Sequence, residues 1–346
     1  MNSSTQPLVS IVTPVYNGAE FLAECIESVL AQTYQNWDYT VVDNCSSDGT
    51  VALARRYAAR DSRIKIQENT EFLRAIPNHN RAFRQISPDS KYCKMVFGDD
   101  WMFPECLERM VALAEAHPSM GLVSAYALEG KRVAWIGLPY PSTVVPGRQI
   151  CRQHFLEKLY VFGSATTVLY RADLVRARDP FFNEGNIHAD TEACFDLLKS
   201  SDFGFVHQVL TCTRLREESL TSMSSDLQTS LGGMLQILSA HGRDYLSEQE
   251  LRSLRDEHLS DYYEFLAKSL MKRRDRKFWS YHRNKLNELG GGFSRTRLTV
   301  EFLKGIGNAA LSPKATLRKI FKTQMKDGAS PNPGSNPTGL PAKETH

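Results

Sequence analysis

The sequence predicts an α/β fold in which a doubly wound, mostly parallel mixed sheet is flanked by helices. Short β-branched runs alternate along the chain with stretches whose apolar residues recur every three or four positions. Strands that alternate with helices in this way build parallel sheets through right-handed crossovers. The chain has 346 residues, of which 42% are hydrophobic, enough to cover both faces of such a sheet.

The first half of the chain supplies strands and helices in a regular order. Residues 8–13 form a short run rich in β-branched side chains, which predicts a buried strand. Pro14 is expected to end this strand. Residues 20–32 place their apolar side chains on one face of a helix. Further strands are expected at 39–42, 63–67, 92–97, 121–128 and 132–136, and helices at 46–59, 75–86 and 104–117.

The second half continues the pattern and then changes character. After a proline-rich loop at 138–147 we expect helices at 148–161 and 190–200 and strands at 166–170 and 204–209. Beyond about residue 225 the chain becomes helical and basic, and residues 327–346 have the Pro, Gly, Ser and Asn content of a disordered tail. The predicted organisation is a domain at 1–225, a basic helical C-terminal extension at 226–326 and a tail at 327–346.

Charge is unevenly distributed between these regions. Residues 251–326 hold 18 Lys and Arg against 7 Asp and Glu, a net charge of +11, whereas the rest of the chain holds 24 against 32, a net charge of −8. We expect the basic helices to pack on the main domain. Contact of these helices with an anionic membrane surface is the open alternative. Nucleic acid is not expected as a partner, because no recognition motif accompanies the basic region.

The cysteines and the N-terminal segment indicate in which cellular compartment the protein is expected. The seven cysteines are scattered and form no C-x-x-C pair, which favours reduced thiols over disulfides or a zinc site. The first basic side chain is Arg55, so we expect no signal peptide. The sequence has no apolar run of about 18 residues, so we expect no membrane-spanning helix. The expected location is cytoplasmic, with the inner face of the membrane as the alternative.

Acidic side chains follow two of the predicted strands. Asp43 ends one strand, and Asp99 and Asp100 follow another. Open α/β sheets bind ligands beyond the carboxyl ends of their strands. Carboxylates that converge there suit Mg²⁺ or Mn²⁺ and a diphosphate, so the pattern indicates an enzyme acting on a nucleotide-linked substrate.

Three segments carry a family resemblance. They are Val-Ser-Ile-Val-Thr-Pro-Val-Tyr-Asn-Gly at 9–18, Ser-Val-Leu-Ala-Gln-Thr-Tyr at 28–34, and Val-Val-Asp-Asn-Cys-Ser-Ser-Asp-Gly-Thr at 41–50. In their order and spacing they resemble the family 2 glycosyltransferases of GT-A fold, over roughly residues 8–225. The resemblance implies a nucleotide-sugar donor, with a UDP-sugar favoured, and a glycan or lipid-linked saccharide acceptor in polysaccharide biosynthesis.

The resemblance also implies residue roles. The nucleotide base would lie beside Thr13, Pro14, Tyr16 and Asp43, and the donor pocket would include Asn78 and Arg81. Asp99 would meet the ribose and, with Asp100, hold the metal. Arg214 and Arg216 lie in a segment that would reach the diphosphate. Asp190 is the first choice for the general base and Glu192 the second.

A single base opposite the leaving group implies inversion in one displacement. No Gln-x-x-Arg-Trp segment is present, which disfavours the polymerising branch of the family. Asn44, Phe97 and Ala189 stand where the family usually has acidic residues. These departures leave open an alternative function, a non-catalytic nucleotide-sugar-binding partner or sensor.

Overall fold

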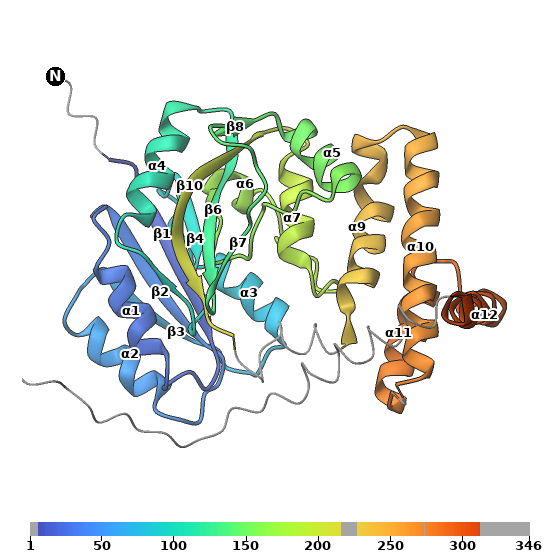
Figure 1. Cartoon of the computed structure of the whole chain (residues 1–346). Coiled ribbons are helices and arrows are strands. Elements are labelled where there is room, and N and C mark those ends of the chain that lie inside the picture. Colours follow the sequence, from blue (N-terminus) through green and yellow to red (C-terminus); the bar gives the residue numbers. More distant parts are fainter. Residues whose placement is uncertain (1–5, 216–226, 273, 312–346) are drawn as a thin grey trace, which may run out of the picture. The chain divides into compact units, whose positions relative to one another are not determined.

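A computed structural model describes residues 6–215, 227–272 and 274–311, with side chains up to residue 306. Ten strands form one mixed sheet in the order β3-β2-β1-β4-β9-β6-β10-β5, with β7 beside β6 and β8 beside β10 (Figure 1). The strands are β1 (Val9–Val15), β2 (Trp37–Asp43), β3 (Ile64–Glu68), β4 (Tyr92–Met95), β5 (Trp101–Met102), β6 (Met120–Glu129), β7 (Arg132–Ala134), β8 (Val144–Val145), β9 (Leu169–Arg171) and β10 (Asp202–Thr213).

The long ladders of the sheet are parallel. β1 pairs in parallel with β2 and β4, β2 with β3, and β6 with β10, whereas the short pairings of β5, β7, β8 and β9 are antiparallel. The predicted mixed, mostly parallel sheet is therefore confirmed. Its parallel part brings the carboxyl ends of β1, β2 and β4 to one edge.

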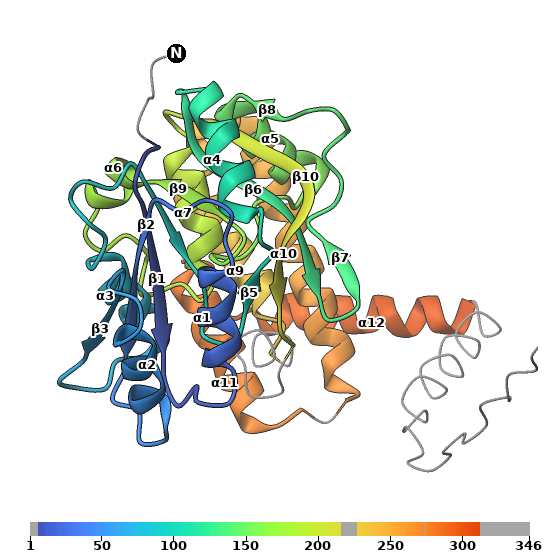
Figure 2. The ribbon, with the colours of Figure 1, turned by 90° about the vertical axis from the view of Figure 1, so that its left-hand side faces the viewer.

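Helices cover both faces of the sheet. Alternation along β1 sends Ile11 into a core with α1 (Leu22–Leu30), α2 (Thr50–Ala58) and α4 (Cys106–Ala116). Val12 points to the opposite core, which contains α3 (Ala75–Phe83). Figure 2, turned from the view of Figure 1, shows α1 and α2 side by side in front of the β1 and β2 strands.

The second core is rich in aromatic rings. It is closed by α5 (Gly147–Glu157), α6 (Ala172–Arg176), α7 (Ala189–Leu197) and α9 (Thr229–Tyr245). Phe155 stacks on Phe195 at 4.5 Å, and Tyr245 of α9 lies edge-on to Phe195 at 5.8 Å. These ring contacts hold α9 against α5 and α7.

Two compact units divide the chain. The first contains residues 1–262 and 276–292, and so includes the sheet, α9, most of α10 (Glu248–Leu270) and α11 (Arg276–Glu288). The second contains residues 263–275 and 293–346, of which the described part holds the end of α10 and α12 (Arg295–Leu311). The domain limits at 225 and 326 stay predictions. No described helix is long and apolar enough to cross a membrane.

Several elements end elsewhere than predicted: β7 ends at Ala134, α5 ends at Glu157, and the first strand runs past residue 13. Pro14 lies inside β1 and does not stop it, because β1 continues to Val15 in register with Asp43. Val12 O accepts from Val96 N, so Pro14, two residues on, also faces β4. The β4 ladder ends at Val12, so the missing N–H of Pro14 falls where no partner strand remains.

Candidate functional site

The edge formed by β1 and β2 carries the first group of predicted residues. Val15 and Asp43 are paired in the ladder, and Asn44 N donates to Val15 O at 2.8 Å. The turn from Phe97 to Asp100 follows β4, the other neighbour of β1. The structure therefore places Tyr16, Asp43 and the Asp99 turn at the carboxyl ends of adjacent strands.

Asp43 has one carboxylate oxygen to which no described residue donates a hydrogen bond. Ser46 N–H donates to its Oδ2 at 3.0 Å, but Oδ1 is buried and accepts no hydrogen bond from the described residues. The residue is 3% exposed. A buried acceptor without a donor destabilises the fold by about 1–3 kcal/mol, a cost that a ligand N–H would remove.

Two exposed aromatic rings lie at the same edge. Tyr16 is 52% exposed and Phe72 57%, and their ring centroids are 4.9 Å apart. Exposed, paired rings present an apolar surface on which a planar base can stack. Phe72 was not predicted, because a single aromatic residue in a loop carries no sequence signal.

Asn44 explains how the Phe72 loop is held. Its Nδ2 donates to Leu73 O at 2.8 Å and its Oδ1 accepts from Leu73 N at 3.0 Å. Asn69 Nδ2 also donates to Asn44 Oδ1. An aspartate could not donate to the Leu73 carbonyl, so the amide at this position has a structural purpose.

The remaining predicted donor residues lie in different environments. Thr13 is fully buried and its Oγ1 accepts from Tyr39 OH at 2.8 Å, so its hydroxyl is already used within the fold. Asn78 is buried and accepts from Asn69 Nδ2 at 2.9 Å, whereas Arg81 is exposed on α3. Pro14 is buried within β1. Their donor-binding roles stay predictions.

Asp100 and Asp99 differ although they are neighbours. Asp100 is 2% exposed, and both of its oxygens accept hydrogen bonds, from Thr166 Oγ1 at 2.7 Å and from Arg214 N at 3.0 Å. Asp99 is half-buried. Of the predicted pair, Asp99 is thus better placed to meet a metal ion, while Asp100 joins three segments of the chain.

Arg214 lies against this turn. Its Nε donates to Asp99 O at 3.2 Å, and its guanidinium pairs with Glu24 and lies 4.6 Å from the Phe21 ring centroid. The structure thus places the Arg214 guanidinium beside Asp99, and its contact with a diphosphate stays a prediction. Arg216 lies outside the described residues.

A metal ion at this edge would have few protein ligands. Among the described residues no group of three His, Cys, Asp or Glu side chains could hold an ion. Mg²⁺ and Mn²⁺ at diphosphates commonly take one or two carboxylates, with phosphate and water oxygens completing the shell. The half-buried Asp99 fits that donor set.

Asp190 lines a cavity of about 240 Å³. It lies in the first turn of α7, half-buried, and Thr191 N donates to its Oδ1 at 2.7 Å. Burial raises the pKa of the Asp190 carboxyl above its ordinary value. The same cavity is lined by Phe97 and Thr213, which neighbour the Asp99 turn and Arg214.

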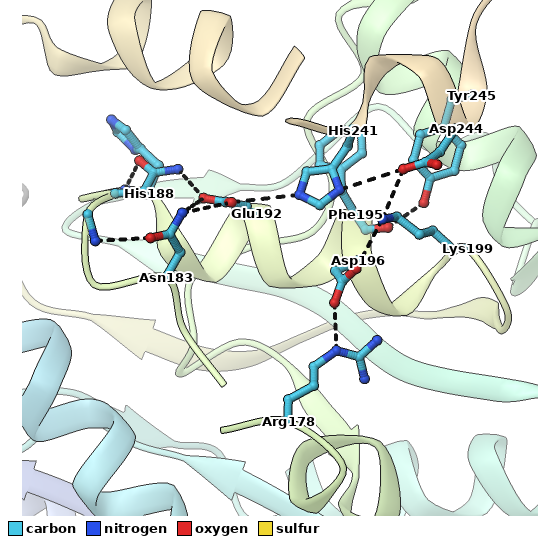
Figure 3. Close-up of polar contacts among 12 residues, drawn as sticks. Arg178, Asn183, His188, Glu192, Phe195, Asp196, Lys199, His241, Asp244 and Tyr245 are labelled. Carbon is cyan, nitrogen blue, oxygen red and sulfur yellow. Dashed lines mark hydrogen bonds and ion pairs between the residues drawn. The ribbon is translucent and has the colours of Figure 1, made fainter. Parts of the chain in front are cut away.

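Glu192 faces a different cavity, of about 680 Å³, which Asp190 does not line. Asn183 donates to Glu192 Oε1 at 3.0 Å and Asn186 to Oε2 at 2.6 Å, and His241 Nε2 lies 3.7 Å away (Figure 3). Burial alone would raise the pKa of Glu192, but these donors hold it below its ordinary value. Glu192 thus fastens the 183–188 loop, and its role as second candidate base is not supported by this placement.

The sequence is similar to known glycosyltransferases, in agreement with the observed fold. Residues 10–178 match the family model described as "Glycosyl transferase family 2". "Putative glycosyltransferase EpsE" of Bacillus subtilis (strain 168) is 35% identical over 159 residues, which are 44% of this chain and 55% of that protein. "Putative teichuronic acid biosynthesis glycosyltransferase TuaG" of the same organism is 31% identical over 106 residues, 31% of this chain and 41% of that one. The chain thus spans about half the length of these relatives.

Solved structures extend the similarity beyond the matched domain. S. aureus TarS 1–349 in complex with UDP-GlcNAc superposes with a TM-score of 0.62 at 16% identity, covering 89% of this chain and 92% of that one. The mannosyltransferase PcManGT from Pyrobaculum calidifontis, in complex with GDP-Man and Mn²⁺, gives 0.54 at 15% identity, covering 93% and 85%. At such identities the similarity concerns the fold, which is that of these glycosyltransferases.

The buried Asp100 predicts how stability depends on pH. Burial, and then the charge of Asp99, raise the pKa of Asp100 from 3.8 to about 7. The folded chain therefore binds more protons than the unfolded chain between about pH 4 and 7, so stability falls as the pH rises through that window. Asp100→Asn should flatten the dependence of the unfolding free energy on pH. Across the whole window, the ionisation of Asp100 changes that free energy by at most about 4 kcal/mol.

Urea unfolding at pH 5, 6, 7 and 8 in EDTA measures the slope. Asp99→Asn is the matched comparison: it removes the neighbouring charge but leaves the bonds of Asp100 in place, so it should reduce the slope only in part. An identical slope in the wild type and Asp100→Asn would contradict the assignment.

Proposed function

Residues 10–178 form a glycosyl transferase family 2 domain, and from this premise we propose that the chain is an inverting, non-processive glycosyltransferase. It would move one sugar from a nucleotide-sugar donor to a glycan or lipid-linked saccharide. The observation that carries the proposal is the buried Oδ1 of Asp43, which has no donor among the described residues and lies at the edge of the sheet that also carries the Asp99 turn. Relatives named for teichuronic acid and O-antigen biosynthesis support a role in polysaccharide assembly.

The base of the donor would lie between Asp43 and the aromatic pair. Uracil carries a ring N–H that can donate to Asp43 Oδ1, so the UDP-sugar that the family resemblance favours fits this acceptor. Tyr16 and Phe72 would contact the base through their exposed rings. That TarS is described with UDP-GlcNAc and PcManGT with GDP-Man supports a nucleotide-sugar donor.

The diphosphate would lie over the Asp99 turn. Asp99 would hold Mg²⁺ or Mn²⁺, which when bound stabilises the negative charge that grows on the leaving diphosphate. Arg214, anchored to Asp99 O and Glu24, supplies a fixed positive charge at the same place. Because the guanidinium is already positioned, little reorganisation is needed as the charge develops.

Asp190 would take the proton of the acceptor hydroxyl. A carboxylate with a raised pKa is a better base than an ordinary one while it remains ionised at neutral pH. It would act on the acceptor hydroxyl as the new glycosidic bond forms, opposite the departing diphosphate. One displacement of this kind inverts the anomeric centre.

We also propose contact with an anionic membrane surface. In the second unit, Val300, Leu303 and Ile306 of α12 are 44%, 60% and 49% exposed and follow one another every three residues. Arg295 and Arg297 at the start of the helix are exposed as well. An amphipathic, basic helix of this kind suits the interface of a membrane, which would place the enzyme at its inner face.

Vesicle co-sedimentation tests the membrane contact. The wild type should pellet with vesicles containing 30 mol% phosphatidylglycerol and remain in solution with pure phosphatidylcholine. Val300→Asp/Leu303→Asp should lose most of the bound fraction, whereas Thr296→Asp should keep more of it. Equal pelleting with both lipids, or no effect of the double variant, would refute the contact.

Asp190→Asn tests the catalytic proposal. It should lower kcat for sugar transfer by about 10²–10⁴-fold, because no base remains for the acceptor hydroxyl. Asp196→Asn, the same change on the same helix, should retain activity, since Asp196 lines the larger cavity and pairs with Arg178. UDP affinity, measured by calorimetry, should be unchanged in both variants.

The competing function makes the opposite prediction. A non-catalytic partner or sensor would bind nucleotide sugars but show no turnover with any acceptor, in the wild type as in Asp190→Asn. Full activity in Asp190→Asn, with the fold intact, would remove Asp190 from the mechanism.

A further inference from the structure

The cavity beside Asp190 has a second wall, built from the other half of the sheet. Glu129 ends β6, Trp135 follows β7, and Thr213 ends β10, and all three line the cavity. None of them was singled out from the sequence. They converge because β6 pairs with β7 on one side and with β10 on the other.

Trp135 is held in an unfavourable state. Its backbone has φ +62°, in the left-handed region that bulky residues rarely adopt. Its Nε1 is buried and has no hydrogen-bond acceptor among the described residues. Strain and an unsatisfied donor in one residue are typical of a binding site, where a ligand supplies the missing partner.

Thr213 repeats this feature on the neighbouring strand. Its Oγ1 is also buried without a hydrogen-bond partner in the described chain. Two unsatisfied polar groups from different elements therefore line the same cavity. Phe97, Phe182 and Ile76 add apolar surface to it. Polar groups set among apolar surface match a sugar ring, which has hydroxyl edges and a C–H face.

The charged groups of the lining are acidic. Asp190 and Glu129 carry carboxyls, and none of the described lining residues is lysine or arginine. Burial lowers the pKa of His79 to about 4 and also lowers that of His188, so neither ring supplies a positive charge at neutral pH. Arg132 is opposite Glu129 in the register of the β6–β7 hairpin but does not line the cavity.

The size of the cavity limits what it holds. At about 240 Å³ it lies below the 300–1,000 Å³ typical of drug-sized ligands, which leaves room for about one ring. A phosphate or carboxylate on that ring would face two acidic side chains with no cation among the described lining residues. Like charges in a partly buried site repel strongly.

We propose that this cavity is the acceptor subsite and that it takes one uncharged sugar ring, held by Trp135 Nε1–H and the Thr213 hydroxyl, and rejects acidic rings through Glu129 and Asp190. The inference rests on the proposed function and adds the chemical class of the acceptor. Trp135 and Thr213 act here as specificity-determining residues, while Asp190 keeps its place as the base.

Saturation-transfer NMR on the full chain with UDP and Mg²⁺, which is diamagnetic, tests the subsite. The probes are two matched pairs, the methyl β-glycosides of glucose and glucuronic acid and those of galactose and galacturonic acid. At least one neutral glycoside should bind, with a dissociation constant about 10-fold or more below that of its uronic acid. Glu129→Gln should narrow this gap.

Trp135→Phe keeps an aromatic ring but removes the N–H, and should weaken the neutral glycoside about 2- to 10-fold. Thr213→Val, which preserves shape, should do the same. UDP affinity in the same samples should not change, which separates a specific role from a loss of folding.

Three results would overturn the inference. These are equal affinity for neutral and acidic glycosides, unchanged binding in both Trp135→Phe and Thr213→Val, or no saturation transfer to any of the four probes. UDP binding in the same samples would then show that only the acceptor subsite had failed. Loss of UDP binding by the wild-type chain would instead count against the proposed function itself.

Discussion

The buried carboxylate of Asp100 is the constraint on which the site depends. It joins the turn after β4 to Thr166, before β9, and to the backbone of Arg214, after β10. Thr166 in turn accepts from Phe97 N at 3.1 Å, so the whole turn is fixed from both ends. This arrangement leaves Asp99 half-buried at the edge of the sheet and sets Arg214 beside it.

The cost of that arrangement is a charge in the interior. Burial raises the pKa of Asp100 to about 7, so the ionised group weakens the fold at neutral pH. Two hydrogen bonds offset part of this cost. A carboxylate that is expensive to bury, and that ties three segments around one turn, is consistent with a site selected for position more than for stability.

Much of the fold could be predicted from the sequence, because strands and helices of the first 130 residues have clear hydrophobic periods. The strand ends then located Asp43 and Asp99 correctly at one edge. The different tasks of Asp99 and Asp100 could not be predicted, since they depend on Thr166 and Arg214, far along the chain. Phe72 was missed for a different reason, since a lone aromatic residue in a loop has no hydrophobic period. Trp135 was expected within a strand at 132–136, but β7 ends at Ala134.

The different positions of Asp190 and Glu192 could have been predicted from the sequence. Residues two apart on a helix point in nearly opposite directions, so Asp190 and Glu192 could not both face one cavity. The structure places them in two, and Asn183 and Asn186 occupy the oxygens of Glu192. Asn44, which departs from the family pattern, proved to hold the loop that carries Phe72.

Metal-dependent binding of the nucleotide tests the central claim most directly. Calorimetric titration of the chain with UDP should give an affinity that rises about 10-fold or more when Mn²⁺ is present. The Asp99→Asn variant should lose that dependence on Mn²⁺ but still bind UDP weakly through the β1–β2 edge. The same UDP affinity with and without Mn²⁺ in the wild type, or an unaltered metal dependence in Asp99→Asn, would contradict the account.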